Sequence, residues 1–139
     1  MLVEKKKFDL RLYVLIKGIA PLEAYLCDEG LARFCTENYR RPDPQNVKRL
    51  YMHLTNFSLN KMSENYVEPE EEFHGNSRAS KRLLTNLLST LQETEGVDLS
   101  QLSRQIRDTV SKAVVAMLPF LASNYWAQVD RDVERARCF

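Results

Sequence analysis

The chain has 139 residues, of which 44% are hydrophobic and 28% are charged, a composition typical of one globular domain or of part of one. The formal net charge of +1 and the lack of any apolar run of transmembrane length argue against nucleic acid or a membrane as a partner. The cysteines, Cys27, Cys35 and Cys138, are odd in number and form no Cys-x-x-Cys pair, which disfavours a disulfide framework or a zinc site.

Alternating hydrophobicity predicts a first strand over residues 9–17. One face of this strand is purely apolar and is expected to be buried; it carries Leu10, Leu12, Val14 and Ile16. Asp9 and Arg11 point together from the opposite face because they are two residues apart. That face is expected to be either solvated or the wall of a polar site.

Two further short strands are predicted over residues 22–27 and 31–36, joined as a hairpin by the turn Asp28-Glu29-Gly30. In the second of them, Arg33 shares a face with Leu31 and Cys35. Its guanidinium therefore needs an anionic partner if that face is buried.

The middle of the chain is less regular. Residues 40–44 are expected to form a loop and residues 46–51 a short helix, whereas residues 52–61 fit neither the strand period nor the helix period. Residues 62–77 are polar and acidic and are expected to form an exposed loop.

The remaining segment is predicted to be helical, with leucine-rich stripes over about residues 80–92 and 100–118. The expected N-caps are Ser77 or Ser80 for the first helix and Ser100 for the second. Gly96 is expected to end the first helix, and Pro119 to kink or end the second. A third, weaker helix is predicted from Tyr125 to Cys138.

Charged and polar side chains gather in the strand-rich segment and just beyond it, and two interpretations of them remain open. They could form a solvated sheet face with structural ion pairs, or a site that binds phosphates and carboxylates. The set comprises Lys7, Asp9, Arg11, Arg33, His53, Thr55, Asn56, Ser58 and Lys81, the last expected in the first turn of its helix.

Three segments resemble the tubulin–tyrosine ligase-like family of ATP-grasp ligases. They are KFDLR at residues 7–11, DEGLARFCT at residues 28–36 and MHLTNFSLNK at residues 52–61; Ser80-Lys81-Arg82 is similar to a later element of the family. The sequences of these segments are most similar to those of the glutamate-ligating members. The resemblance implies an α+β fold, in which the central part of an ATP-grasp-like catalytic domain consists of an antiparallel, hairpin-rich sheet followed by packed helices.

The resemblance also implies a reaction. ATP phosphorylates a glutamate side chain of a tubulin C-terminal tail, and the amine of free L-glutamate attacks the acyl phosphate to form an isopeptide bond. Charge builds on phosphoryl and acyl oxygens, so catalysis depends mostly on positioning and on cations.

Roles for individual residues follow from the same resemblance. Nucleotide binding is expected of Lys7, Asp9, Thr55 and Asn56. Binding of the incoming amino acid is expected of Arg33, Phe57, Ser58 and Lys81, although the family commonly has Tyr where this chain has Phe57. Arg11 and His53 are expected to face the acceptor tail or the acyl phosphate as catalytic residues. The carboxylates that hold Mg²⁺ in the family are expected outside this chain.

We therefore expect one partial catalytic domain over residues 1–139, strand-rich over 7–61, a loop over 62–77 and helical over 78–139. The expected partners are tubulin tails and microtubules, and the expected location is the cytoplasm and cytoskeleton, extending to the cilium and basal body. Two alternatives stay open: a tubulin glycine ligase, and an inactive fragment that only binds tubulin or microtubules.

Overall fold

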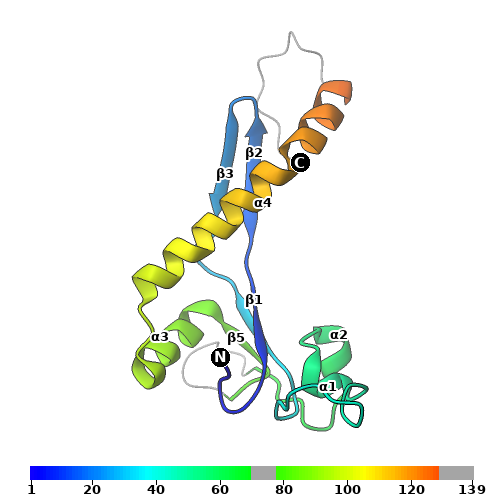
Figure 1. The fold of residues 1–139 in the computed structure, drawn as a ribbon. Helices are drawn as coiled ribbons and strands as arrows, with labels where there is room; N and C mark the ends of the chain where they lie inside the picture. Colours follow the sequence, from blue (N-terminus) through cyan, green and yellow to red (C-terminus); the bar gives the residue numbers. More distant parts are fainter. Residues whose placement is uncertain (70–77, 129–139) are drawn as a thin grey trace. The chain divides into compact units, whose positions relative to one another are not determined.

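The structure, a computed structural model, describes residues 1–69 and 78–128 (Figure 1). The chain divides into two compact units: residues 1–12 with 29–97, and residues 13–28 with 98–139. Antiparallel sheets and helices make up both units, so the predicted α+β class is confirmed. No helix of the described ranges is both long enough and apolar enough to cross a membrane.

The first unit is built on a three-stranded antiparallel sheet with the strand order β1-β4-β5. Its strands are β1 (Phe8–Arg11), β4 (Leu31–Phe34) and β5 (Lys81–Leu83). The predicted hairpin between residues 22–27 and 31–36 is wrong, because β4 pairs with β1 and β5 and not with the strand that precedes it. Gly30 is needed for a close approach, since a Cβ there would lie 2.6 Å from the carbonyl oxygen of Arg11.

The helix α3 (Leu84–Glu95) covers one face of this sheet. The core that they share contains Val3, Ala32, Phe34, Leu87 and Leu91, each at most 5% exposed. Gly96 ends the helix in the left-handed conformation, as predicted. The predicted Ser80 cap is wrong, because residues 81–83 are extended to pair with β4 and the helix begins only at Leu84; Ser77 lies outside the described residues.

Two four-residue helices, α1 (Leu50–His53) and α2 (Phe57–Asn60), complete the first unit. The short helix predicted over residues 46–51 therefore forms later in the sequence, and residues 44–48 form turns. At the beginning of the chain, residues 3–6 make a tight turn with Glu4 and Lys5 at positive φ. A bidentate ion pair from Arg82 to Glu4 holds this turn, and the Arg82 guanidinium lies 4.2 Å from the centre of the Phe34 ring.

The second unit consists of the hairpin β2 (Val14–Ile19) and β3 (Leu22–Leu26) and the helix α4 (Leu99–Gln128). The single strand predicted over residues 9–17 is thus wrong: it breaks at Leu12 and Tyr13, and its two halves join different sheets. Of the four residues expected on its buried face, Leu10, Leu12 and Ile16 are partly buried, while Val14 is 37% exposed.

The helix α4 continues through Pro119 to Gln128, so of the two outcomes predicted at Pro119, a kink or an end, the end is wrong. Val114 and Tyr125, both buried, anchor the helix on either side of the proline. Its N-cap is Asp98 and not Ser100, because the Asp98 carboxylate accepts the backbone N–H groups of Ser100 and Gln101 at 2.9 and 3.1 Å. The separate helix predicted from Tyr125 is part of α4 up to Gln128, and the rest of that prediction lies outside the described residues.

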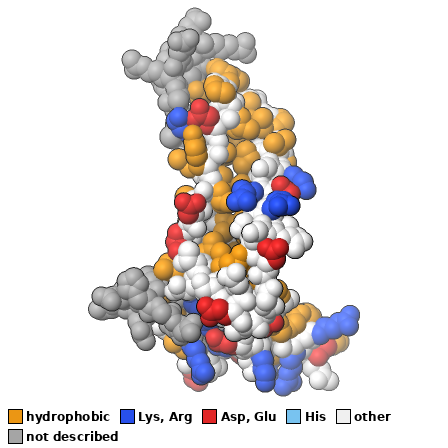
Figure 2. Space-filling model, turned by 90° about the vertical axis from the view of Figure 1, so that its left-hand side faces the viewer, with side chains coloured by type: hydrophobic (Ala, Val, Ile, Leu, Met, Phe, Trp, Pro, Cys, Tyr) orange, Lys and Arg blue, Asp and Glu red, His pale blue; other side chains and the backbone are white. Residues whose placement is uncertain are grey.

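Hydrophobic side chains gather on the surface of the unit built from β2, β3 and α4 (Figure 2). Phe120 is 73% exposed and Tyr25 54%. The first unit, by contrast, carries all of the predicted site residues.

Candidate functional site

Three of the predicted residues lie in one row across the three-stranded sheet. The register places Asp9 of β1 opposite Arg33 of β4, and Arg33 opposite Lys81 of β5. Directly opposed residues of antiparallel strands point to the same side of the sheet. We call this side, which is opposite the core residues Ala32 and Phe34, the polar face.

Asp9 and Arg33 form a bidentate ion pair in the middle of this row. Nε of Arg33 donates to Oδ1 of Asp9 at 2.9 Å, and Nη2 donates to Oδ2. The side chains are 26% exposed for Arg33 and 36% exposed for Asp9. The expected anionic partner of Arg33 is therefore confirmed, and the pair holds the planar guanidinium in a fixed orientation on the polar face.

Lys81 occupies a different structural setting from the one predicted. It belongs to β5 and not to the first turn of a helix, because α3 begins only at Leu84. Its ammonium lies 5.3 Å from the centre of the Phe57 ring. Lys81 is half-buried and contributes a cation at the edge of the row.

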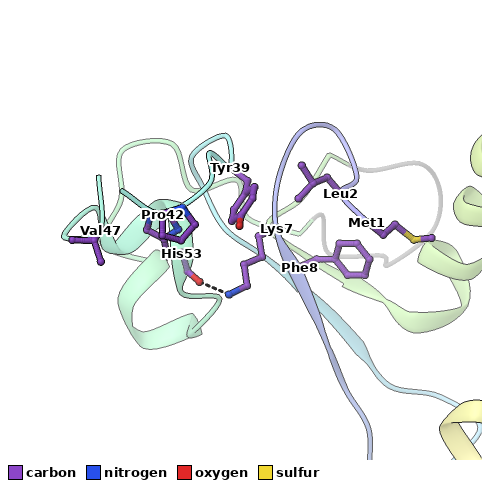
Figure 3. Close-up of a pocket in the computed structure, with 8 residues that line it drawn as sticks. All are labelled: Met1, Leu2, Lys7, Phe8, Tyr39, Pro42, Val47 and His53. Atoms are coloured by element: carbon purple, nitrogen blue, oxygen red, sulfur yellow. Dashed lines mark hydrogen bonds between the residues drawn. The ribbon is translucent and has the colours of Figure 1, made fainter. Parts of the chain in front are cut away.

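Lys7 and His53 meet at the start of β1, where the Lys7 ammonium donates to the backbone carbonyl of His53 at 2.8 Å (Figure 3). The His53 ring is held by Asn46: its Nε2 lies 3.2 Å from the Asn46 carbonyl and 3.1 Å from its Oδ1. Both partners are acceptors, so we assign the hydrogen of the ring to Nε2. His53 is thus oriented by a structural hydrogen bond, and its backbone positions Lys7.

A cavity of about 510 Å³ opens beside these two residues (Figure 3). Its size suits a small molecule, and its wall is mostly apolar with one ammonium and one imidazole. It is lined by Met1, Leu2, Lys7, Phe8, Tyr39, Pro42, Val47 and His53.

Arg11 lies at the other end of β1, opposite Leu31, and is exposed. It lies four positions after Lys7 along extended backbone, a span of about 13 Å. The two residues expected to be catalytic, Arg11 and His53, therefore lie at opposite ends of β1 and do not contact each other.

Asn60, which the sequence did not single out, fixes the segment that carries Thr55 and Asn56. It is 1% exposed, and its Oδ1 accepts both the backbone N–H and the hydroxyl of Thr36 at 3.1 Å. Its Nδ2 donates to the carbonyls of Leu54 at 2.7 Å and Asn56 at 3.1 Å. We call these four hydrogen bonds the Asn60 clamp. The many hydrogen-bonding side chains in residues 52–61 indicated such a network, but the sequence did not show which of these residues would be buried.

Thr55 lines a second, very small cavity of about 10 Å³ together with Arg33, Phe57 and Lys81. Asn56 and Ser58 are exposed, and the side chain of Asn56 makes no capping hydrogen bond to α2. The structure therefore brings Thr55 beside Arg33 and Lys81 and leaves Asn56 and Ser58 exposed to solvent.

Four residues form what we call the Phe57 cluster: Phe57, Lys61, Tyr66 and Lys81. The Lys61 ammonium lies 5.6 Å from the centre of the Phe57 ring, and the Tyr66 ring packs edge-on against it at 6.0 Å. The buried Tyr66 hydroxyl has no hydrogen-bond partner among the described residues. Burial raises the pKa of Tyr66, and the charge of Glu68 raises it further. Neither Lys61 nor Tyr66 was predicted as a site residue.

Among the described residues there is no cluster of metal ligands, and the thiol of Cys35 is not activated. Across residues 1–69 and 78–128, no group of three or more His, Cys, Asp or Glu side chains could hold a metal ion. Burial raises the pKa of the Cys35 thiol despite the opposing charge of Lys7, so this cysteine is a neutral packing residue.

Comparison with known proteins yields one family. The model of the Tubulin-tyrosine ligase family matches residues 1–134. The chain is 40% identical over 139 residues to tubulin polyglutamylase TTLL11 of Homo sapiens, covering 100% of this chain and 19% of that protein. It is 46% identical over 122 residues to tubulin polyglutamylase ttll-11 of Caenorhabditis elegans, covering 88% of this chain and 17% of that protein. It is 37% identical over 138 residues to tubulin polyglutamylase TTLL6 of Mus musculus, covering 99% of this chain and 16% of that protein. The chain thus spans about a fifth of the length of the curated relatives it matches.

Proposed function

Because the chain belongs to the tubulin–tyrosine ligase family, we propose that it forms the central part of an ATP-dependent carbon–nitrogen ligase that attaches glutamate to glutamate side chains of tubulin C-terminal tails. The names of the relatives, all tubulin polyglutamylases, favour glutamate over glycine. The observation that carries the proposal is the row of Asp9, Arg33 and Lys81 on the polar face. A site built from cations and a carboxylate suits a reaction in which negative charge builds on oxygens and no protein nucleophile is needed.

The nucleotide would be held around Lys7, Asp9, Thr55 and Asn56. ATP, when bound, supplies the phosphoryl group that activates the acceptor carboxylate. The Lys7 ammonium and the exposed Asn56 amide are donors suited to phosphate oxygens, and the Thr55 hydroxyl can both donate and accept. Asp9 already accepts two hydrogen bonds from Arg33, and its remaining lone pairs can accept from ribose hydroxyls.

The described residues suit ATP but do not offer a binding site for Mg²⁺. Asp9 is the only carboxylate in the row, and both its oxygens are engaged by Arg33. Since the described ranges contain no cluster of candidate ligands, we propose that the carboxylates for Mg²⁺ come from outside them.

The nucleotide would lie at the Asp9 end of the row, and the incoming amino acid at the Lys81 end. Arg33 and Lys81 would supply positive charge for its carboxylates, and Phe57, whose ring lies beside Lys81, and the exposed Ser58 would contact the amino acid. Arg11, exposed at the end of β1, would meet the acidic acceptor tail. His53 contributes by positioning Lys7 through its backbone carbonyl.

The partners in this proposal are tubulin tails on microtubules and free L-glutamate. Such substrates place the protein in the cytoplasm and on the cytoskeleton, including the axonemal microtubules of cilia.

The test is incorporation of labelled L-glutamate into purified microtubules by the complete protein to which this chain belongs, with and without ATP. ATP-dependent labelling that disappears when the tubulin tails are removed by proteolysis supports the proposal. Labelling by glycine in place of glutamate would make the chain a glycine ligase. Binding to microtubules without incorporation of either amino acid would reduce it to a binding module.

A further inference from the structure

Arg82 is a buried cation on the core side of the three-stranded sheet. It lies opposite Ala32 in the register, and its side chain is only 8% exposed. The guanidinium lies 4.2 Å from the centre of the Phe34 ring, and its Nε donates to the Ala79 carbonyl at 3.0 Å. Nη1 and Nη2 donate to the two carboxylate oxygens of Glu4 at 3.1 and 3.0 Å. Glu4 thus provides the anion that a buried guanidinium needs.

Glu4 belongs to a tight turn that its own sequence does not favour. The N–H of Val3 donates to the Lys6 carbonyl at 3.2 Å and the N–H of Lys6 donates to the Val3 carbonyl at 2.9 Å, so Glu4 and Lys5 are the central residues. Their φ angles are 51° and 61°. Positive φ at both central positions is typical of a type I′ turn, which favours Asn-Gly because side chains are strained there. This turn therefore depends on its contacts with neighbouring segments.

The turn leads directly to Lys7, the lysine proposed to bind the nucleotide. Two backbone hydrogen bonds join this stretch to the residues after β4: the Tyr39 N–H donates to the Lys5 carbonyl at 2.8 Å, and the Cys35 N–H donates to the Lys7 carbonyl at 2.9 Å. The Lys7 ammonium is held by the His53 carbonyl at 2.8 Å. The buried ion pair adds an attachment to β5, so the turn is held from two strands of the sheet.

We propose that Arg82 and Glu4 are positioning residues, which fix the turn of residues 3–6 and thereby direct the Lys7 ammonium toward the phosphates of ATP. This inference rests on the proposed function, in which Lys7 binds the nucleotide. Arg82 lies on the core side of the sheet and acts through the turn. An ion pair with a merely structural role would lower the stability but leave the ATP affinity of the folded protein unchanged.

The experiment measures equilibrium binding of ATP with Mg²⁺ to the complete protein to which this chain belongs. Glu4→Gln is expected to raise the Kd for ATP about fivefold, less than the roughly tenfold expected when Lys7→Met removes the contact itself. In the Lys7→Met background, Glu4→Gln should add less than about twofold, because a residue that acts through Lys7 is not additive with it. The matched control is Glu23→Gln, which breaks an exposed ion pair of the second unit and should stay within about twofold of the parent.

A second substitution tests whether the conformation of the turn is what matters. Glycine adopts positive φ without steric cost, so Lys5→Gly combined with Glu4→Gln should return the Kd to within about twofold of the parent. The half-saturating concentration of L-glutamate should stay within about twofold in Glu4→Gln. Circular dichroism checks that each variant is folded. If Glu4→Gln alone does not fold, the pair Glu4→Gln and Arg82→Met removes the uncompensated charge and should show the same fivefold loss.

The outcomes separate this inference from the proposed function. Equal ATP affinity in the parent and in Glu4→Gln overturns the inference and leaves the ligase proposal standing. Additive effects of Glu4→Gln and Lys7→Met, or a loss that Lys5→Gly does not restore, likewise overturn it, because Glu4 would then act by its charge and not through the turn. A parent protein that binds no ATP overturns both proposals.

Discussion

The two units of the molecule are stabilised in different ways. In the first, ion pairs join Asp9 to Arg33 and Glu4 to Arg82, and Asn60 ties three segments together by hydrogen bonds. In the second, a hairpin and one long helix pack mainly through apolar side chains, of which Tyr25, Met117 and Phe120 stay exposed. Polar networks specify one geometry, whereas apolar packing tolerates adjustment. The unit that carries the candidate chemistry is therefore the one with defined polar geometry.

The largest difference between the units should appear when the same residue type is truncated in each. Phe34 is 1% exposed in the first unit and Phe120 is 73% exposed in the second. We expect Phe34→Ala to lower the free energy of unfolding by about 3–5 kcal/mol, because a buried ring leaves a cavity. Phe120→Ala should change it by less than about 0.5 kcal/mol. Urea unfolding of both variants measures this, and similar losses in the two would mean that Phe120 is covered in solution.

The next comparison is between a buried asparagine of the first unit, Asn60, and an exposed one of the second, Asn124. Asn60→Ala removes four hydrogen bonds and leaves the buried N–H of Thr36 unsatisfied, so we expect a loss of about 2–3 kcal/mol. Asn124 makes one exposed bond to the Phe120 carbonyl in α4, and Asn124→Ala should cost less than about 0.5 kcal/mol. Thermal unfolding monitored by circular dichroism compares them. If Asn60→Ala unfolds like the parent, the clamp is not a source of stability.

An ion pair of each unit can be compared by its effect on the use of ATP and L-glutamate. Asp9→Asn leaves the Arg33 guanidinium without its anionic partner and replaces one of the two acceptor oxygens proposed for the ribose with an amide donor. We expect the half-saturating concentrations of both ATP and L-glutamate to rise about tenfold. Glu23→Gln breaks the exposed pair with Lys17 in the second unit and should leave both values within about twofold. Steady-state titrations decide the matter, and unchanged ATP dependence in Asp9→Asn would exclude Asp9 from the nucleotide site.

The smallest effect concerns pH. Partial burial alone would raise the pKa of Glu29, but hydrogen bonds from Gly30 and Thr85 outweigh it and lower the pKa below 4.5. A carboxyl with a lowered pKa in the folded state contributes stability above its ordinary pKa, and that contribution is lost as the pH falls through the folded-state value. Because Glu29 is exposed, we expect less than about 0.5 kcal/mol. Unfolding free energies measured from pH 6 down to pH 3 should fall less steeply in Glu29→Gln than in the parent, and identical slopes would refute the assignment.

Local patterns in the sequence predicted the elements better than their partners. Alternation identified the strand residues of β1 and β4, and the leucine stripe with Gly96 identified most of α3. Strand pairing depends on residues far apart in the chain, and the best local turn signal, Asp28-Glu29-Gly30, lay between strands of different sheets. Pro119 was overestimated as a helix breaker because burial of Val114 and Tyr125 cannot be read from local propensity.

In the candidate site, too, the sequence predicted individual residues better than their partners. Family motifs indicated Asp9, Arg33 and Lys81, and the requirement for an anion beside Arg33 followed from its apolar neighbours. The bidentate geometry, the Asn60 clamp and the place of Lys61 over the Phe57 ring arise only when β1, β4, β5 and the residues after α1 come together.

The hairpin of β2 and β3 also has a consequence for the order of folding events. It interrupts the first unit between Leu12 and Glu29, and a hydrogen bond of 2.9 Å from the Cys27 N–H to the Tyr13 carbonyl closes its base. A hairpin forms within microseconds, and once formed it removes the intervening chain from the entropy cost of joining β1 to β4. The pairing of Arg11 with Leu31 then closes only a short loop instead of one that contains all of residues 13–28. The inserted hairpin thereby lowers the entropy cost of closing the very sheet that it interrupts.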